Sequence, residues 1–468
     1  MKRKKIGYAV FILFFFILCC VPSLGMLVGK QAQPAANEIL AAPPSLFDPE
    51  GGWNSQVLQQ ATDYIADRFA FRQEMVSANG FLQAKLFGRS AADQVLVGKE
   101  DWLFYDETKG DYLRTQVLSQ REIQGIARSL KLIQNSCEEQ GIQFLFMTAP
   151  NKNSLYPQYM PDVGKPLEKE KNLTLLQRAL EKEGVRYLDL ESLFLQQDEI
   201  LYFHGDSHWN NKGAAFARDW IMEALGRQEE MKWSQQPYTL EKTHLGDLYE
   251  MLYPKGKGLE EEVHFERDFA YEDVSGQEGD GDRMLIQTLC QGKEGALYMF
   301  RDSFGNALYP FLADSFGSSV FSRSIPYDVS GAVKSGADTL MIEIVERNIS
   351  WLKTYVPLMQ APPADPQELG EAGSAEVCGS ARAVIESPCD LEGCLKISGS
   401  YSLKEPGDDD RVLISGGGAW YEAFPIGSEE GELVFTAYLP LEENRGNWQI
   451  LVGKDGLWSR IHVTIGEN

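Results

Sequence analysis

Two short segments hold residue types that together could perform acyl transfer through a serine. The first, residues 203–213, contains Asp206 and His208, and the second, residues 301–306, contains Ser303. A serine nucleophile needs an imidazole to remove its proton and an acid to orient that imidazole. The two segments therefore predict one active site, although a long stretch of chain separates them.

His208 is the best candidate for the base of this site. Asp206, two positions earlier, can point to the same side of an extended loop and hold one ring nitrogen, which leaves the other nitrogen free to accept the proton of Ser303. Ser207 is less suitable as the nucleophile because its side chain and that of His208 should point to opposite sides. Taken separately, the Asp–His pair could be a capped turn and Ser303 a polar turn residue.

Alternating strand and helix patterns surround both segments. Four apolar runs are typical of buried strands, at 142–147, 185–190, 296–300 and 339–345. Two amphipathic stretches are typical of helices, at 121–140 and 170–183. This alternation predicts a mainly parallel sheet with helices on both faces. Function in such sheets collects beyond the carboxyl ends of the strands, and Ser303 follows one of these ends.

Each segment is expected to lead into a helix. Asn210 or Asn211 is a natural N-cap for a helix that runs to about Leu225. A second helix is expected to begin near Asn306 or Ala307 and to direct its free N–H groups back toward the serine. The segment 244–248 is expected to form a loop over the sheet, with His244 possible at the cleft. Glu343, Glu346 and Arg347 are expected to form ion pairs that fix helices to the sheet.

The net charge of the chain restricts the class of partner, and its length indicates more than one domain. A net charge of −24 excludes nucleic acid and anionic lipid as main partners, because both would repel the body of the protein. The chain, at 468 residues, is longer than one ordinary domain. We predict an N-terminal anchor at 1–30, a stalk at 31–50, an α/β domain at 51–360, a linker at 361–375 and a small C-terminal β-sandwich at 376–468.

The N-terminal segment predicts a membrane anchor. Residues 2–5 are basic, and the apolar run from Ile6 to about Val28 could cross a bilayer about 30 Å thick. The positive-inside rule then places the body on the extracellular or periplasmic side of a single-pass anchor in the cell membrane. A cleaved signal peptide is the alternative, because residues 23–25 offer small side chains near a plausible cleavage point.

The cysteines and the C-terminal aromatic residues are less specific indicators of structure and function. The cysteines beyond the apolar run are too few and too irregular for a disulfide scaffold or a zinc site, and we predict neither a metal nor a cofactor. Two of Cys378, Cys389 and Cys394 could form one disulfide, or all three could be free thiols. The aromatic residues of the β-sandwich could stack on a glycan, but core packing is the simpler interpretation: Trp420, Tyr421, Trp448 and Trp458.

Together the motifs resemble the alginate O-acetyltransferase family of SGNH-hydrolase-like proteins, which includes exported proteins called DHHW. The resemblance covers roughly residues 66–355 and rests on Asp206-x-His208-Trp209, Asp302-Ser303-Phe304, 97–99 with 102–104, and 150–152 with Tyr156-Pro157. It implies a circularly permuted SGNH-like α/β domain in which the Asp–His pair precedes the serine. It also implies transfer of acetyl groups onto exported polysaccharide, commonly supplied by a membrane-bound O-acyltransferase, and a carbohydrate-binding β-domain in some members.

The resemblance implies roles for Ser303 as nucleophile, His208 as base and Asp206 as its orienting acid. Trp209 would form a wall of the site. The chain departs from the family at Arg301, where many relatives have glycine. Arg301 could narrow the oxyanion region or hold an acidic sugar, or it could form an ordinary ion pair.

The expected reaction is transfer of acetyl through a serine acetyl-enzyme to a hydroxyl of an exported cell-surface polysaccharide. Backbone N–H groups near Ser303 would hold the tetrahedral oxyanion, together with Asn151 or Asn306, either of which could instead cap a turn. A carbohydrate esterase would use the same three residues, with water replacing the sugar hydroxyl. A non-catalytic envelope protein that binds glycan is the alternative from a different class.

Overall fold

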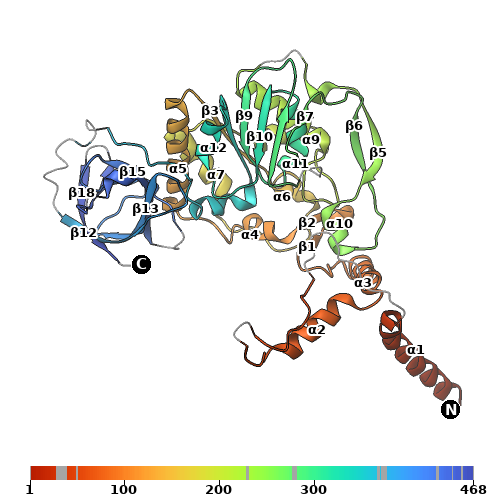
Figure 1. Cartoon of the computed structure of the whole chain (residues 1–468). Coiled ribbons are helices and arrows are strands. Elements are labelled where there is room, and N and C mark those ends of the chain that lie inside the picture. The colour runs from red at the N-terminus through yellow and green to blue at the C-terminus, as the bar shows by residue number, and fades with distance from the viewer. Residues whose placement is uncertain are drawn as a thin grey trace.

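The computed structural model describes residues 2–27, 40–48, 51–227, 231–276, 282–365, 369, 377–427, 432–444, 446–454 and 457–466. An α/β body occupies the centre of the molecule, a β-rich unit lies beside helix α5 (Gln120–Glu139), and the N-terminal helices lie at the opposite end (Figure 1). The mainly parallel sheet with a β-sandwich-like C-terminal unit confirms the predicted fold class.

The central sheet has seven strands in the order β4-β3-β11-β9-β10-β8-β7. Its strands are β3 (Gln143–Ala149), β4 (Tyr187–Leu188), β7 (Glu272–Asp273), β8 (Leu285–Leu289), β9 (Ala296–Phe300), β10 (Ser318–Ser322) and β11 (Thr339–Val345). The five strands from β4 to β10 pair in parallel, whereas β8 and β7 add an antiparallel edge. The carboxyl ends of β9 and β11 therefore lie side by side at one edge of the sheet.

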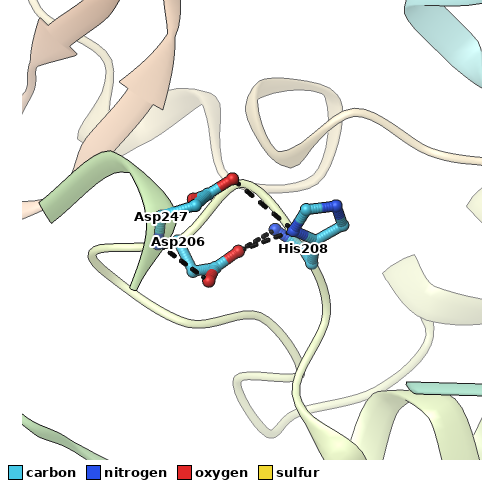
Figure 2. A group of neighbouring side chains, drawn as sticks. All are labelled: Asp206, His208 and Asp247. Carbon is cyan, nitrogen blue, oxygen red and sulfur yellow. Dashed lines mark hydrogen bonds and ion pairs between the residues drawn. The ribbon is translucent and has the colours of Figure 1, made fainter. Parts of the chain in front are cut away.

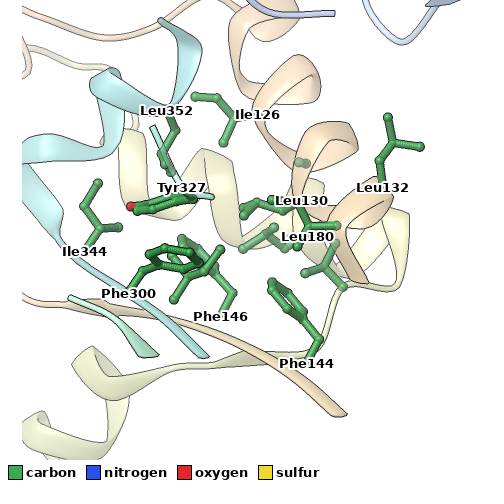
Figure 3. Close-up of a cluster of buried hydrophobic side chains, with 14 of the residues drawn as sticks. Ile126, Leu130, Leu132, Phe144, Phe146, Leu180, Phe300, Tyr327, Ile344 and Leu352 are labelled. Atoms are coloured by element: carbon green, nitrogen blue, oxygen red, sulfur yellow. The ribbon is translucent and has the colours of Figure 1, made fainter. Parts of the chain in front are cut away.

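Alternate residues of each buried strand face opposite cores. Phe144 and Phe146 of β3 pack with Leu130 of α5 and Leu180 of α7 (Asn172–Glu183) on one face, as Figure 3 shows. Leu145 and Met147 belong to the core on the other face. The second core is covered by α8 (Leu190–Leu195), α9 (Asn211–Ala224) and α11 (Gly305–Ala313). A strand buried on both faces has a continuous apolar sequence, which explains why these runs were recognisable.

The predicted helix ends depend on local capping chemistry. Ser119 and Glu122 form a capping box at the start of α5, in which the side chain of each bonds the backbone N–H of the other. At the start of α9, the Asn210 side chain accepts a 2.9 Å hydrogen bond from the Gly213 N–H, as the N-cap prediction requires. Helix α11 begins at Gly305, one residue earlier than predicted.

The C-terminal unit is one mostly antiparallel sheet in the order β15-β14-β17-β18-β12-β13-β16. Its strands are β12 (Val377–Glu386), β13 (Cys394–Leu403), β14 (Arg411–Ser415), β15 (Tyr421–Ala423), β16 (Leu433–Pro440), β17 (Gln449–Lys454) and β18 (Leu457–Ile465). A bridge between Phe424 and Thr436 brings the two edge strands together, so the sheet nearly closes. Tyr421 and Trp458 are buried, and Trp420 and Trp448 pack against apolar clusters, as the core interpretation predicted.

The N-terminal region differs from the expectation. A helix, α1, covers Lys2–Leu27, yet within the described part of the chain we find no helix with the length and apolarity that spanning a membrane requires. The predicted membrane anchor is therefore not supported. Two helices follow, α2 (Val57–Arg68) and α3 (Arg72–Phe87), which are separate because Phe71 adopts a left-handed φ of 65° between them.

The remaining elements complete the body around the sheet. A two-stranded ribbon joins β1 (Val95–Val97) to β2 (Leu103–Tyr105), and a hairpin joins β5 (Tyr238–His244) to β6 (Glu260–Phe265). Helices α6 (Lys152–Leu155), α10 (Asp247–Leu252) and α12 (Val329–Lys334) are short. The described cysteines, including Cys378, Cys389 and Cys394, are free thiols.

Candidate active site

The loop that carries Ser303 is fixed by the acidic side chain beside it. Asp302 accepts the Phe304 N–H at 2.9 Å through Oδ1 and the Val345 N–H at 2.7 Å through Oδ2. The second bond ties the loop after β9 to the end of β11. Ser303 therefore stands at the carboxyl end of the parallel strands, at the start of α11, where the sequence pattern placed it.

The loop that carries His208 closes on itself and on the serine loop. Its ends form a bridge between Tyr202 and Trp209, and the Phe203 N–H donates to the His208 carbonyl at 3.3 Å. The Trp209 indole N–H donates to the Phe304 carbonyl at 3.0 Å. Because that carbonyl belongs to the residue after Ser303, the hydrogen bond fixes the two loops relative to each other.

These loops bring the three predicted side chains together. His208 Nε2 lies 2.8 Å from Ser303 Oγ, and His208 Nδ1 lies 2.7 Å from Asp206 Oδ1. A neutral imidazole whose Nδ1–H is held by the carboxylate presents the lone pair of Nε2 to the serine hydroxyl. The geometry is that of a relay that can remove the proton of Ser303.

Asp206 accepts four hydrogen bonds from the protein. Its Oδ1 also accepts the His208 N–H at 2.9 Å, and its Oδ2 accepts the Asp247 N–H at 3.0 Å and contacts His244 Nε2 at 2.8 Å. Burial alone would raise the pKa of Asp206, but the charges and hydrogen bonds of His208 and His244 hold this pKa well below its usual range. Asp206 is therefore an anion that orients His208.

The pKa of His208 lies above the ordinary value for histidine. Burial disfavours the imidazolium, but the charge and hydrogen bond of Asp206 outweigh burial, and Asp247 adds to the effect. His244 behaves in the same way, because burial is again outweighed by Asp206. A raised pKa makes His208 a stronger base and requires a higher pH to keep it unprotonated.

Asp247 completes an acidic cluster around the imidazole, shown in Figure 2. Its Oδ1 accepts the Ser207 N–H at 2.8 Å, and its Oδ2 accepts the Ser207 hydroxyl at 2.6 Å and lies 3.7 Å from His208 Nδ1. Both carboxylates of the cluster are already engaged by N–H and O–H donors of the protein. The donor set therefore fits a hydrogen-bonded relay better than a metal site.

A buried lysine, Lys152, binds the backbone of the His208 loop. Lys152 donates from Nζ to the carbonyls of Phe203, His204 and Asp206 at 3.0, 2.9 and 2.6 Å. Burial lowers the pKa of Lys152 to about 8, despite nearby carboxylates, which still leaves the amine largely protonated at neutral pH. Sequence reasoning missed this role, because nothing in the sequence indicates which carbonyls a lysine will meet.

The site opens into a cleft of about 690 Å³. Ser303, His208, Trp209 and Asn306 are among its lining residues. Others line it as well, including Tyr105, Phe203, His244, Asp247, Glu250, Met251, Arg323 and Arg347. A cleft of this size admits a sugar ring together with a short acyl group.

Asn151 does not lie where the oxyanion prediction needs it. It is buried as the N-cap of α6, its side-chain amide donates to Asp111 at 3.2 Å, and its backbone N–H donates to Glu346 at 2.8 Å. It is not among the residues that line the cleft. Asn306 does line the cleft, but its amide donates to Asp282 at 3.2 Å and its carbonyl oxygen accepts from Arg301.

Arg301 supports the serine loop from inside the protein. It is buried and donates to the carbonyls of Asp302 and Arg283 at 3.2 and 3.1 Å. A Cβ at Gly305 would lie 2.5 Å from Arg301 Cδ, so the glycine lets the arginine pass beneath α11. Burial, together with the charge of Arg323, lowers the pKa of Arg301 to about 10. Arg301 is absent from the cleft lining, so neither the sugar-binding nor the narrowing role fits it.

His244 and Asp247 reach the site because two backbones approach closely. A Cβ at Gly246 would lie 2.3 Å from the Gly205 carbonyl oxygen, so only glycine allows the segment 244–247 to contact the His208 loop. The His244 ring also stacks on Phe203, with centroids 3.7 Å apart. The histidine was recognisable as a possible cleft residue, whereas the Asp247 contact required the three-dimensional structure.

The fold and the site define a hydroxyl–imidazole–carboxylate relay at the carboxyl edge of an SGNH hydrolase-like sheet. Residues 95–284 match the family model described as the SGNH hydrolase-like domain of acetyltransferase AlgX. This part of the chain is therefore similar to the SGNH hydrolase-like domain that the motif resemblance predicted. The match includes Asp206 and His208 and ends before Ser303.

Several solved structures are similar to the chain at low identity. Bacillus cereus PatB1, solved with a sulfonyl adduct, is 17% identical over 55% of this chain and 97% of its own, with a TM-score of 0.42. The O-acetyltransferase domain of Pseudomonas putida AlgJ is 16% identical over 55% and 92%, with a TM-score of 0.37. Pseudomonas aeruginosa AlgX is 15% identical over 76% and 89%, with a TM-score of 0.36. No curated protein matches the chain.

Proposed function

We propose that the protein is an O-acetyltransferase that moves an acetyl group through Ser303 onto hydroxyls of an exported cell-surface polysaccharide. The main support is the 2.8 Å distance between Ser303 Oγ and His208 Nε2. The other ring nitrogen of His208, Nδ1, lies 2.7 Å from Asp206 Oδ1. The acetyltransferase family match over residues 95–284 supports the reaction class.

The proposed reaction has two half-reactions. In the first, His208 takes the hydroxyl proton as Ser303 Oγ bonds to the carbonyl carbon of an acetyl donor, and the imidazolium returns the proton to the leaving group as its bond breaks. In the second, His208 takes the proton of a sugar hydroxyl, whose oxygen attacks the acetyl-enzyme. The Ser303 ester bond then breaks, and the serine recovers its proton from His208.

The acceptor, the location and the partner are proposals of the same kind. The exported polysaccharide and a membrane-bound O-acyltransferase as acetyl supplier follow from the family resemblance. A body on the extracellular or periplasmic side follows from the exported acceptor that the family resemblance implies. The size of the cleft, about 690 Å³, suits a sugar acceptor.

Ser303→Ala tests the proposal directly. The purified chain is incubated with an acetyl ester and a polysaccharide-derived oligosaccharide, and acetylated sugar is measured by mass spectrometry. We expect acetate on the oligosaccharide with the wild type and none with the variant, while oligosaccharide binding is retained. Unchanged acetylation by the variant would refute the serine mechanism, and release of acetate to water alone would identify an esterase.

A further inference from the structure

The cleft contains two arginines with different surroundings. Arg323 forms an ion pair with Asp282 and also donates to its carbonyl at 3.1 Å. The guanidinium of Arg347 forms no hydrogen bond or ion pair with any residue that the structure describes, contrary to the expected ion pair. Arg347 is nevertheless half-buried in the wall of the cleft.

Two aromatic rings hold the Arg347 guanidinium in place. Its Cζ lies 5.2 Å from the ring centroid of Tyr105 and 5.8 Å from that of Phe304. Such contacts stabilise the cation and leave the N–H groups of the guanidinium unused. Partly desolvating a cation without an anionic partner costs free energy, so this arrangement is typical of a group that awaits a negatively charged ligand.

Arg347 lies on the same side of the sheet as the nucleophile. It follows β11 by two residues, and the Val345 N–H bond to Asp302 ties the end of β11 to the serine loop at 2.7 Å. Phe304, the residue after the nucleophile, also contacts the His208 ring, with centroids 4.8 Å apart. Arg347 and His208 thus both contact the ring of Phe304, the residue that follows Ser303.

Within the part of the chain that the structure describes, neither asparagine predicted as an oxyanion donor is freely available to the cleft. Asn151 lies outside the cleft lining, and Asn306 is engaged by Asp282 and Arg301. The Ser303 backbone N–H makes no hydrogen bond with a residue in the described ranges. An acyl-transfer site requires pre-positioned donors for the tetrahedral oxyanion. The Arg347 guanidinium and the Ser303 backbone N–H are the two groups that remain to supply them.

We propose that Arg347 is a catalytic residue that donates to the acyl carbonyl oxygen of the substrate as this oxygen becomes an oxyanion. The inference rests on the proposed acyl transfer through Ser303. As the bond between Ser303 Oγ and the carbonyl carbon forms, the carbonyl π electrons move to oxygen. Arg347 and the Ser303 N–H hold this charge until the leaving-group bond breaks and His208 protonates the leaving oxygen. The ligand class is an acetyl ester.

The test uses hydrolysis of an aryl acetate by the full chain, because this reaction needs no sugar. We expect Arg347→Met to lower kcat by about 10²–10³ with little change in KM, as when one oxyanion donor is lost. Arg347→Lys keeps the charge without the planar fork, and we expect a loss of about tenfold. Arg178→Met is the control, because Arg178 is exposed and pairs with Glu170 at the surface.

A tetrahedral analogue gives an independent measurement. Phenylboronic acid forms an anionic tetrahedral adduct with a serine hydroxyl, and its inhibition constant should weaken in Arg347→Met by a factor similar to the loss in kcat. A wild-type kcat in both Arg347→Met and Arg347→Lys would overturn the proposed role of Arg347 as an oxyanion donor. If the methionine variant does not fold, full kcat in Arg347→Lys would overturn it equally.

Two further outcomes separate this inference from competing accounts. If Arg347→Met hydrolyses the aryl acetate normally but fails to acetylate a uronic acid oligomer, Arg347 binds an acidic acceptor and the oxyanion role is wrong. If Ser303→Ala hydrolyses the aryl acetate as fast as the wild type does, the proposed function is wrong and the inference is wrong with it. If turnover depends on Ser303 and is unaffected at Arg347, only the inference is wrong.

Discussion

Asp206 is the residue on which the chemistry of the site depends. It orients His208 through Oδ1 and is itself fixed by His244 and the Asp247 N–H at Oδ2. Four donors make it a poor base and a strong orienting anion. The consequence at the residue scale is a His208 whose pKa exceeds that of an exposed histidine.

The first prediction concerns the pH dependence of the reaction. A base works only when unprotonated, so activity should rise with pH through the pKa of His208, which lies above the ordinary value of about 6.5. In Asp206→Asn the raising charge is removed while burial remains, so the acid limb should move to lower pH. The loss of orientation should also reduce kcat by about 10²–10⁴. The pH profile of kcat/KM with an aryl acetate measures both effects, and an unmoved acid limb contradicts them.

The second prediction separates the donor role of His244 from its charge. His244→Leu removes one of the four hydrogen-bond donors to Asp206. The loss of this charge-assisted hydrogen bond should lower kcat by about tenfold. His244→Gln keeps a donor and should restore most of kcat. The pKa of His244 is raised, so its imidazole is protonated more readily than an ordinary histidine. Both variants remove this source of positive charge beside Asp206, so the pKa of His208 and the acid limb should move upward in both. Equal kcat in the two variants would show that the hydrogen bond is irrelevant.

The site was partly predictable because residue type limits which side chains can act. The chain has five histidines, and two of them, His208 and His264, have an acid two positions earlier. His208 follows Asp206 in a polar loop, whereas His264 follows Glu262 within strand β6. The directions of Arg301 and Asn151 could not be predicted, because both side chains face inward from positions adjacent to the site. Burial direction depends on the neighbouring elements, which a local motif does not contain.

At the scale of elements, the His208 loop is held by groups from two separate parts of the chain. Lys152 of α6 binds three of its carbonyls, while Glu260 of β6 accepts the N–H groups of His204 and Gly205 at 2.6 and 2.7 Å. Alongside these two side chains, the backbone N–H groups of Leu103 and Tyr249 donate to the carbonyls of His204 and Gly205, at 2.8 Å each. Its position relative to Ser303 depends on them.

The third prediction concerns this support. Lys152→Met keeps the length of the side chain but removes a donor from three carbonyls, of which that of His204 keeps the Leu103 N–H at 2.8 Å, so the free energy of unfolding should fall by about 3 kcal/mol. Lys85→Met is the control, because the Lys85–Asp101 pair is exposed and should change stability by less than about 1 kcal/mol. Urea denaturation measures both values. Similar stability in the two variants would rule out the structural role of Lys152.

Continuous apolar runs made the central parallel strands predictable from sequence, and β3, β9 and β11 lie at the predicted positions within two residues. The hairpin of β5 and β6 was missed because β5 is exposed almost throughout and lacks an apolar face. Strand β12 was missed because its small and polar residues carry little signal. Pairing with neighbours, which the sequence does not display, stabilises both.

At the scale of the whole molecule, the β-rich unit is joined to the α/β body by a core and by buried charge. Phe424 and Ile426, after β15, belong to the same core as α5 and α7. Glu422 accepts from Arg128 of α5 at 2.6 and 2.7 Å and from Arg411 of β14 at 2.6 Å. Burial raises the pKa of Glu422, but the two arginines outweigh it and lower this pKa overall. The two units should therefore unfold together.

The fourth prediction compares a buried interdomain ion pair with an exposed one. Glu422→Gln removes the buried anion that Arg128 and Arg411 share, although Arg128 keeps its 3.1 Å contact with Glu183, and should destabilise the protein by about 3 kcal/mol. Asp409→Asn removes the more exposed contacts with Lys182 and Lys454 and should cost about 1 kcal/mol or less. Differential scanning calorimetry should show one transition in all three proteins. Two separate transitions in the wild type would contradict the joined core.

The most direct test of the account is to trap the acetyl-enzyme. The full chain is mixed with an aryl acetate, quenched with acid at short times, digested and analysed by mass spectrometry. We predict that the peptide containing Ser303 gains the mass of one acetyl group in the wild type, and that Ser303→Ala gains none. Acetylation of another residue, or turnover of the ester with Ser303 always unmodified, would contradict the central claim.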